Sequence, residues 1–330
     1  MVRSVLVIGG TEFFGKHAVE LFLDDGWRVT VLSRGRRRPG WWDRVEHIAC
    51  DRTDREAFSA ALRGRSFDVV FDNVAFDAPD VSSALEVFRQ TVGHYVLTSS
   101  GAVYAERSGD RVFAHASEDE PMVDARADNH PYVAGKRRAE RALVDHAGGL
   151  PYTVIRPTVV QGPEDPTRRP WFWIQRILDG GPLLVGDPRP EPAWNHAYSE
   201  DVARMVVRVA GNPVAFGKTY NAAGGEVITL VDYLWALGEA LGRRPTLVRA
   251  APGAWKEALP DYAPPFGRRF VMDIARARAD LGYEPTPAGV WIAATARWFA
   301  DAYRGEDSHG YGRRQTEIAF AQSFVTTERP

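Results

Sequence analysis

The sequence has one cysteine, little net charge and no HExxH motif, and each scarcity excludes a class of protein. Cys50, at the end of VEHIAC, cannot form a disulfide within the chain and is typical of a small core residue. A formal net charge of −2 gives no overall field that would attract nucleic acid or an anionic membrane. Paired cysteines and aspartate-rich calcium loops are also missing, so we expect no metal site.

The sequence likewise lacks any run of about 18 apolar residues, and the initial MVRSVLVIGG has no signal-peptide cleavage region. We therefore expect a cytoplasmic, soluble protein without a membrane segment. Its 330 residues are enough for one large domain or two smaller ones.

Residues 1–100 alternate between strand and helix patterns. Strands that read as continuous apolar runs are typical of parallel sheets covered on both faces, so we expect an α/β fold with a doubly wound parallel sheet. Ligands of such sheets bind at the carboxyl ends of the strands. Those ends are Gly9, Ser33, Asp51, Asn73 and Ser100.

The composition changes after residue 160, where a proline-rich stretch contains Trp171–Phe172–Trp173. We expect a dinucleotide-binding core in residues 1–160 and a mainly substrate-binding region in 161–330, with some segments returning to the core. Three local features are also expected. They are a capping box at Thr53–Glu56 that opens a helix, a long surface loop over 105–130, and a polar tail at 305–330 that is frayed or packed on a partner subunit.

The stretch VLVIGGTEFFG, residues 5–15, predicts a phosphate cradle. Val5–Ile8 reads as a buried strand, the next two glycines as a tight turn, and a helix is expected from near Gly15. The free N–H groups and the positive end of that helix would face an anion. Glu12 stands midway between Gly9 and Gly15, where its carboxylate should repel a phosphate unless it turns away or accepts a hydroxyl. The alternative is an ordinary glycine turn.

Tyr132 and Lys136 form the strongest chemical signal. Four residues apart on a predicted helix, they share one face. A nearby ammonium stabilises a phenolate and lowers the pKa of a tyrosine from about 10, which makes it a usable general acid or base. The preceding strand ends in Ser99 and Ser100. We choose Ser100 to bind a carbonyl oxygen because Ser99 should face the other side of the strand. A surface pair is the alternative for Tyr132 and Lys136.

The chain resembles the extended short-chain dehydrogenases/reductases of the NAD-dependent epimerase/dehydratase group. The matching pieces occur in the order typical of that group, roughly over residues 1–300: Gly9 to Gly15, Asp51, Asn73 to Ala75, Ser99 to Tyr104, Tyr132 to Lys136, Arg156–Pro157, Gly162–Pro163, His196 to Ala203 and Tyr220–Asn221. The resemblance implies a Rossmann domain with seven parallel strands and a small C-terminal substrate domain. Glu12 departs from it, because it replaces the middle glycine of the GxxGxxG fingerprint.

The resemblance also implies roles for single residues. Tyr132 would be the acid/base and also bind the cofactor, Lys136 would hold the nicotinamide-ribose hydroxyls and tune Tyr132, and Ser100 would polarise the substrate oxygen. Asp51 would lie beside the adenine. The other expected cofactor-binding residues come from the glycine turn and the strand ends: Gly9, Thr11, Glu12, Phe13, Phe14, Gly15, Ser33, Arg34, Asn73 and Ala75.

The loop after the second strand favours NADP, with NAD as the second choice. NAD sites usually carry an acidic residue there, whereas this sequence reads SRGRRR over residues 33–38. Arg34 could hold a 2′-phosphate through paired charge-assisted hydrogen bonds, with Ser33 adding a hydroxyl. A solvated basic loop is the alternative, and it explains Arg36 to Arg38 well.

We expect an enzyme that transfers a hydride at a secondary alcohol or ketone carbon, with a nucleotide sugar as the substrate that the resemblance implies. Gly101 and Ala102 stand where dehydratases of the group carry an acidic pair, so 4,6-dehydration is disfavoured and epimerase and ketoreductase remain. Trp171 and His196 are candidate substrate contacts; a lid or homodimer face and a packed histidine are the alternatives.

The rival hypothesis is a non-catalytic Rossmann protein that binds RNA or a nucleotide. Some relatives with a GGTxFxG turn are linked to RNA binding, and Glu12 and the arginines of residues 34–38 agree with that pattern. The intact Ser100, Tyr132 and Lys136 set and the mildly acidic net charge favour the enzyme.

Overall fold

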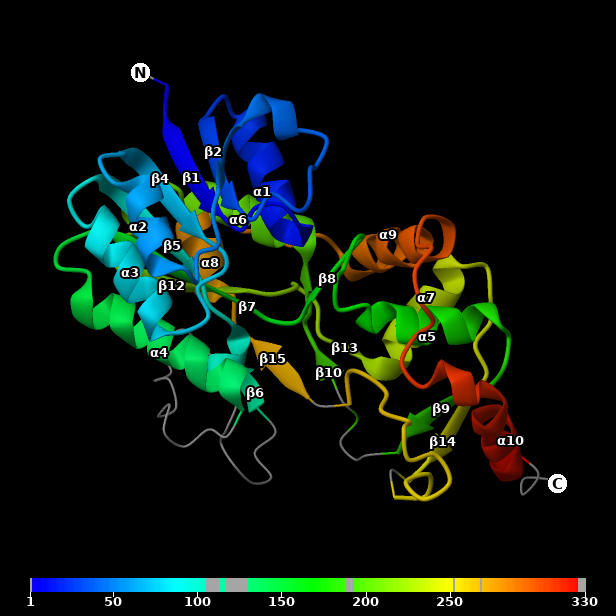
Figure 1. The fold of residues 1–330 in the computed structure, drawn as a ribbon. Helices are drawn as coiled ribbons and strands as arrows, with labels where there is room; N and C mark the ends of the chain where they lie inside the picture. Colours follow the sequence, from blue (N-terminus) through cyan, green and yellow to red (C-terminus); the bar gives the residue numbers. More distant parts are fainter. Residues whose placement is uncertain are drawn as a thin grey trace.

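The computed structural model describes residues 2–104, 113–116, 130–187, 191, 193–251, 253–267 and 269–325. Within them a seven-stranded sheet forms the centre of one lobe (Figure 1). Its neighbouring strands all run parallel, as predicted. In spatial order they are β12 (Lys218–Ala222), β7 (Tyr152–Pro157), β5 (Val92–Thr98), β4 (Phe67–Asp72), β1 (Ser4–Ile8), β2 (Arg28–Ser33) and β3 (Glu46–Ala49).

Helices cover both faces of this sheet, which confirms the doubly wound Rossmann arrangement. One face packs against α1 (Phe13–Asp24), α6 (Ser199–Val209) and α8 (Ala275–Leu281), and the other against α2 (Arg55–Leu62), α3 (Ala78–Phe88) and α4 (Pro131–His146). Because successive side chains of a strand point to opposite faces, Val69 and Phe71 of β4 enter the first core and Val70 enters the second. Continuous apolar strands therefore fill two layers at once.

The remaining elements lie mainly in a second lobe (Figure 1). Four short strands form a sheet in the order β13 (Ile228–Thr229), β10 (Ala193–Trp194), β15 (Phe270–Met272), β6 (Phe113–Ala116). Two further pairs are β8 (Val160–Gln161) with β11 (Ala197–Tyr198) and β9 (Leu183–Gly186) with β14 (Leu247–Ala250). Helices α5 (Arg169–Leu178), α7 (Leu230–Ala240), α9 (Ala288–Asp301) and α10 (Arg314–Val325) surround a third apolar core that includes Trp173 and Trp291. Short 3₁₀ helices are η1 (Trp42–Arg44), η2 (Gly101–Tyr104), η4 (Pro213–Ala215) and η5 (Tyr311–Arg313).

Several local expectations need correction. Helix α2 is capped by Asp54 rather than Thr53: the Asp54 side chain accepts the backbone N–H of Ala57 at 3.0 Å. Helix α1 begins at Phe13, two residues before Gly15. The expected loop over 105–130 contains β6, and residues 105–112 and 117–129 lie outside the described residues.

The frayed alternative for the tail is wrong for the described part of residues 305–330, because α10 packs on its own chain; packing on a partner subunit stays a prediction. Glu317 of α10 is buried and pairs with Arg176 of α5 at 3.0 Å. Cys50 is buried, as predicted. Among the described residues, no helix combines the length and apolar character needed to cross a bilayer.

Candidate active site

The turn after β1 needs its glycines. Gly9 has φ +86°, in the left-handed region, and a Cβ there would lie 2.4 Å from the side chain of Val74. A Cβ on Gly15 would lie 2.8 Å from both the Gly9 carbonyl oxygen and the Asn73 Nδ2. Asn73 Nδ2 also donates to the Gly9 carbonyl at 3.3 Å. The turn is therefore pressed directly against α1 and braced by the end of β4.

The N-terminus of α1 has no side-chain cap. Its N-cap residue, Glu12, has extended backbone and makes no side-chain cap, and its carboxylate instead pairs with Arg37 at 3.0 Å. The carboxylate thus has a cationic partner on the loop after β2. Phe13 has φ +51°, a conformation rare for an aromatic residue, and its buried ring packs edge-on against Phe14. An uncapped helix end beside a glycine cradle fits the pyrophosphate of a dinucleotide, and Thr11 lies in the same turn.

The ends of β2 and β3 present a mixture of charges. The Ser33 hydroxyl is 3.0 Å from His47 Nε2 and accepts the Gly35 N–H at 3.2 Å, so it already has partners. Arg34 is exposed. Asp51 accepts hydrogen bonds from Thr53, and these bonds, with smaller contributions from Arg34 and Arg36, lower the pKa of its carboxyl group. The exposed Asp51 carboxylate thus lies near Arg34, the residue expected to bind the 2′-phosphate of NADP.

Tyr132 and Lys136 lie on the same face of α4 but in different surroundings. Tyr132 is 42% exposed, whereas Lys136 is 2% exposed and donates to the carbonyl oxygens of Ala75 and Thr98, both at 2.8 Å. The Phe76 ring lies 4.7 Å from the Lys136 Nζ and 6.4 Å from the Tyr132 ring. Burial lowers the pKa of Lys136 to about 8. A half-exposed phenol and a buried ammonium therefore meet at one aromatic side chain.

Helix α4 also holds the strand end that carries Ser100. Lys136 binds the carbonyl of Thr98, and Glu140, one turn later, accepts the hydroxyl of Ser99. Arg137 Nε donates to the Val103 carbonyl at 3.0 Å. Ser99 is buried against α4, as the choice of Ser100 assumed, and Ser100 is partly exposed with its hydroxyl accepting the Ala102 N–H at 3.1 Å. The helix thus clasps the chain on both sides of Ser100.

The two candidate substrate residues have apolar neighbours. Trp171 stacks on Phe299 with ring centroids 6.1 Å apart, and its indole N–H donates to the Glu306 carbonyl. His196 is 5% exposed and stacks on Trp194 at 4.8 Å, while its Nδ1 lies within hydrogen-bonding distance of Gln161. Burial lowers the pKa of His196 well below its ordinary value, so its imidazole is neutral at physiological pH. Trp171 and His196 are therefore both packed against other residues of the chain. A substrate role for either residue stays a proposal.

The family model described as the NAD dependent epimerase/dehydratase family matches residues 5–92 and 81–223. The chain belongs to this family. Among curated relatives, the chloroplast stem-loop binding protein of 41 kDa b of Arabidopsis thaliana is 25% identical over 297 residues, covering 86% of this chain and 75% of that protein. A dTDP-glucose 4,6-dehydratase of Streptomyces antibioticus is 27% identical, covering 78% and 70%. UDP-glucuronic acid 4-epimerase from Bacillus cereus, solved with NAD, matches with a TM-score of 0.71 at 19% identity, covering 91% and 100%.

Four residues of the candidate site were not identified by the sequence analysis. They are Phe76, beside Lys136 and Tyr132, and three buried charged residues behind Lys136: Arg52, Asp72 and Glu140. Glu140 could have been found, because it follows Lys136 by one helical turn. Asp72 could have been suspected because it directly precedes Asn73 at the strand end. Nothing in the local sequence distinguishes Arg52 from an exposed arginine.

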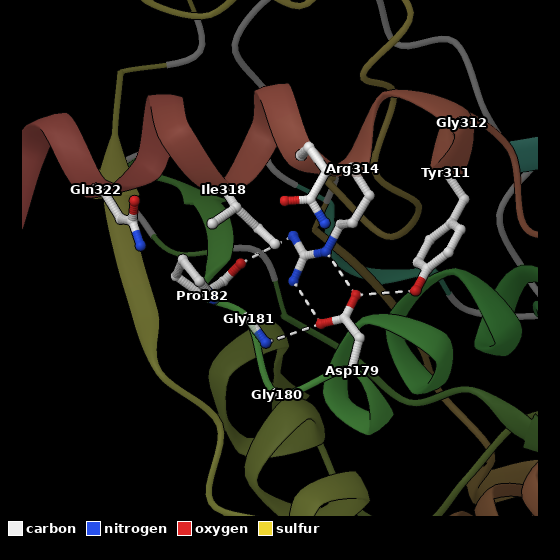
Figure 2. A pocket seen from close by; sticks show the side chains of 10 residues that line it. Asp179, Gly180, Gly181, Pro182, Tyr311, Gly312, Arg314, Ile318 and Gln322 are labelled. Atoms are coloured by element: carbon white, nitrogen blue, oxygen red, sulfur yellow. Dashed lines mark hydrogen bonds and ion pairs between the residues drawn. The ribbon is translucent and has the colours of Figure 1, made fainter.

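A separate groove of about 470 Å³ lies between α5 and α10, at the opposite end of the molecule from α4 (Figures 1 and 2). Figure 2 shows Asp179 at its base, held by both Arg314 Nε at 2.8 Å and Arg314 Nη2 at 3.0 Å. Tyr311 and the Gly181 N–H donate to the same carboxylate. These polar groups form hydrogen bonds with one another. The groove is therefore a contact region that holds α10 against the end of α5.

Proposed function

We propose that the chain is an NAD(P)-dependent oxidoreductase or epimerase acting at a secondary alcohol or ketone carbon, with Tyr132 as general acid/base. The observation that carries this proposal is the half-exposed Tyr132 side chain on the same helical face as the buried Lys136 ammonium. The bound nicotinamide would supply the hydride acceptor or donor. Tyr132 would take or give the hydroxyl proton, and Ser100 would hydrogen-bond the substrate oxygen.

A nucleotide sugar is the substrate class that we propose. Its support is the family, together with relatives and structural neighbours named for dTDP- and UDP-sugars. Gly101 and Ala102, in place of an acidic pair, favour an epimerase or ketoreductase over a 4,6-dehydratase, although one relative is named as such a dehydratase.

Mass spectrometry of the nucleotide retained by the purified full chain tests this function. Retained oxidised cofactor, with interconversion of sugar epimers, would support a redox-neutral epimerase. An empty site that fills with NADPH and reduces a keto-sugar nucleotide would support a reductase. A chain that neither retains nor binds either dinucleotide would contradict the proposal.

For the cofactor we propose NADP(H) ahead of NAD(H), with Arg34 holding the 2′-phosphate. NADP(H) is expected to bind at least about tenfold more tightly, because a charge-assisted hydrogen bond contributes about 1.5–3 kcal/mol. Arg34→Ala should remove most of this difference, since Ser33 already has partners. Titration of wild type and variant with both dinucleotides measures it. Arg36→Ala is the matched control from the same loop. Equal affinities in wild type would favour NAD, which the solved neighbour contains.

Glu12 is expected to weaken cofactor binding. Glu12→Gly and Glu12→Gln should each tighten binding by about 1 kcal/mol, the size of a screened interaction near the surface. Both should act alike, because Glu12 has extended backbone that any residue adopts. Calorimetric titration checks this, with Glu20→Gln on the same helix as the control. Weaker binding in both variants would mean that Glu12 contacts the cofactor.

The rival function, RNA binding, has one specific observation in its favour, the relative named as a stem-loop binding protein. Binding of a structured RNA whose affinity falls steeply with salt, together with no dinucleotide binding, would select this rival. The exposed arginines of residues 34–38 would then form the expected contact surface for RNA.

A further inference from the structure

Seven charged residues lie buried behind the candidate active site. One of them, Arg137, donates to the Val103 carbonyl, and the formal charges of the other six cancel. Each is less than a tenth exposed, although charged side chains are almost never buried without partners. They come from the loop after β3, the end of β4, α3, α4 and β7. Of these six, the three cations are Arg52, Lys136 and Arg156, and the three carboxylates are Asp72, Asp80 and Glu140.

Arg52 forms hydrogen bonds with both aspartates of this group. Its Nη1 donates to both oxygens of Asp72, at 2.7 and 2.6 Å, and its Nη2 donates to the Asp80 carbonyl at 2.6 Å. The Tyr95 hydroxyl donates to Asp72 Oδ2 at 2.6 Å. Asp72 is 0% exposed, so every interaction of its carboxylate is made in a medium of low dielectric constant.

The same two aspartates shape the loop that receives Lys136. Asp72 accepts the Val74 N–H at 3.2 Å, and Asp80 accepts the Phe76 N–H at 2.8 Å. Between these positions lies Ala75, whose carbonyl binds the Lys136 ammonium. The other carbonyl partner, Thr98, ends β5, and Asp72 pairs in register with the residue before it. The ammonium therefore lies at the edge where β4 and β5 end, the edge at which Asp72 stands.

We propose that Asp72 is the buried counter-ion that keeps Lys136 charged, and that Arg52 is a positioning residue that fixes Asp72 and limits its pull on the ammonium. This rests on the proposed function only for the use of Lys136 in catalysis. Among the charged groups around Lys136, Asp72 most strongly opposes the lowering of its pKa by burial, followed by Glu140 and Asp80, whereas Arg52 adds to that lowering. Arg156 on β7 neutralises Glu140, and Tyr95 on β5 donates to Asp72.

The two members of the Arg52–Asp72 pair should move the Lys136 pKa in opposite directions. Asp72→Asn removes the attracting charge and should lower the Lys136 pKa by about one unit or more. Arg52→Met removes a repelling charge and frees Asp72 to face the ammonium, so the pKa should rise. A general loss of packing around Lys136 would instead shift its pKa in the same direction in both variants.

Lysine-specific NMR of the full chain measures this directly. The sequence contains four lysines, Lys16, Lys136, Lys218 and Lys256, so a protein labelled at the lysine Cε and Nζ gives few signals. Lys136→Arg identifies the Lys136 signal, which is then followed against pH in each variant. The measurement needs neither substrate nor cofactor, so opposite shifts in a chain without redox activity would uphold the counter-ion and contradict only the proposed function.

Asp280→Asn is the matched control, because Asp280 pairs with Lys218 at 2.7 Å and accepts the Tyr220 hydroxyl at 2.9 Å. Asp280 lies in a similar group of lysine, aspartate and tyrosine at another place in the fold. Its substitution should therefore leave the Lys136 pKa unchanged. If Arg52→Met does not fold, the double variant with Asp72→Asn replaces it, since a buried ion pair removed as a whole is better tolerated. Its Lys136 pKa should lie between those of Asp72→Asn and wild type. An unchanged Lys136 pKa in Asp72→Asn, or equal shifts in the single and double variants, would overturn the proposal.

Discussion

Replacing Tyr132 with phenylalanine is expected to lower kcat by about 10²–10⁴-fold, the usual contribution of a general acid or base. The substitution keeps the ring that lies beside Phe76 and His130 and removes only the hydroxyl. Tyr132 is 42% exposed, so its loss of one oxygen should leave the stability of the fold unchanged. Turnover of a nucleotide sugar, followed through the absorbance of the reduced nicotinamide, measures the effect against wild type.

Tyr311→Phe is the control for this experiment. Tyr311 is also partly exposed and its hydroxyl donates to Asp179, but it lies in the groove beside α10. It should keep full activity. Dinucleotide affinity should be the same in all three proteins, which would locate the Tyr132 defect in the chemical step. Activity of Tyr132→Phe within about threefold of wild type would contradict the assignment of Tyr132 as the general acid/base.

The dependence of activity on pH should reflect the titration of Lys136. Its pKa, lowered by burial to about 8, means that the ammonium is present below that pH and is lost as the pH rises through it. Activity that depends on the positive charge should therefore decline on the alkaline side near pH 8. The Asp72→Asn variant should move this decline to lower pH.

The sheet was predictable because its signal is local. Val5 to Ile8 is apolar at every position, which is required of a strand buried on both faces, and Gly9 follows at the φ of +86° that a turn there needs. The helix bearing Tyr132 and Lys136 was equally clear, and it runs from Pro131 to His146. Periodicity and turn chemistry depend on residues a few positions apart, so the sequence carries them directly.

The buried charges could not be predicted for the opposite reason. Arg52 and Asp72 are 20 residues apart and meet only because β3 and β4 belong to one sheet with their carboxyl ends at the same edge. Glu317 pairs with Arg176 across 141 residues, which is why the polar tail looked frayed in sequence. A charged residue in a sequence indicates an exposed position unless its partner is known, and the partner here is supplied by the tertiary fold.

Glu140→Gln is expected to lower the free energy of unfolding by about 3–5 kcal/mol, the cost of leaving a buried ion without its partner. Glu140 and Arg156 are 2% and 6% exposed at their side chains, and their shortest ion-pair distance is 2.5 Å. Burial disfavours the charge on Arg156, but its hydrogen bonds and charge interactions with Glu140 and Tyr104 together outweigh burial and raise the pKa of the guanidinium. Because a guanidinium stays protonated in proteins, Arg156 remains charged after the substitution, and its charge becomes uncompensated in the interior.

Urea unfolding of the full chain, followed by tryptophan fluorescence, measures this loss. Glu46→Gln is the matched control, because Glu46 pairs with Arg65 at a similar distance of 2.6 Å but both side chains are at least 40% exposed. That surface pair should contribute less than about 1 kcal/mol. The double variant Glu140→Gln, Arg156→Met should recover part of the loss, since it removes the unpaired charge as well. A Glu140→Gln variant no less stable than Glu46→Gln would mean that water reaches Arg156. The link from α4 through Glu140 to Ser99 and Arg156 would then contribute little to holding the candidate active site together.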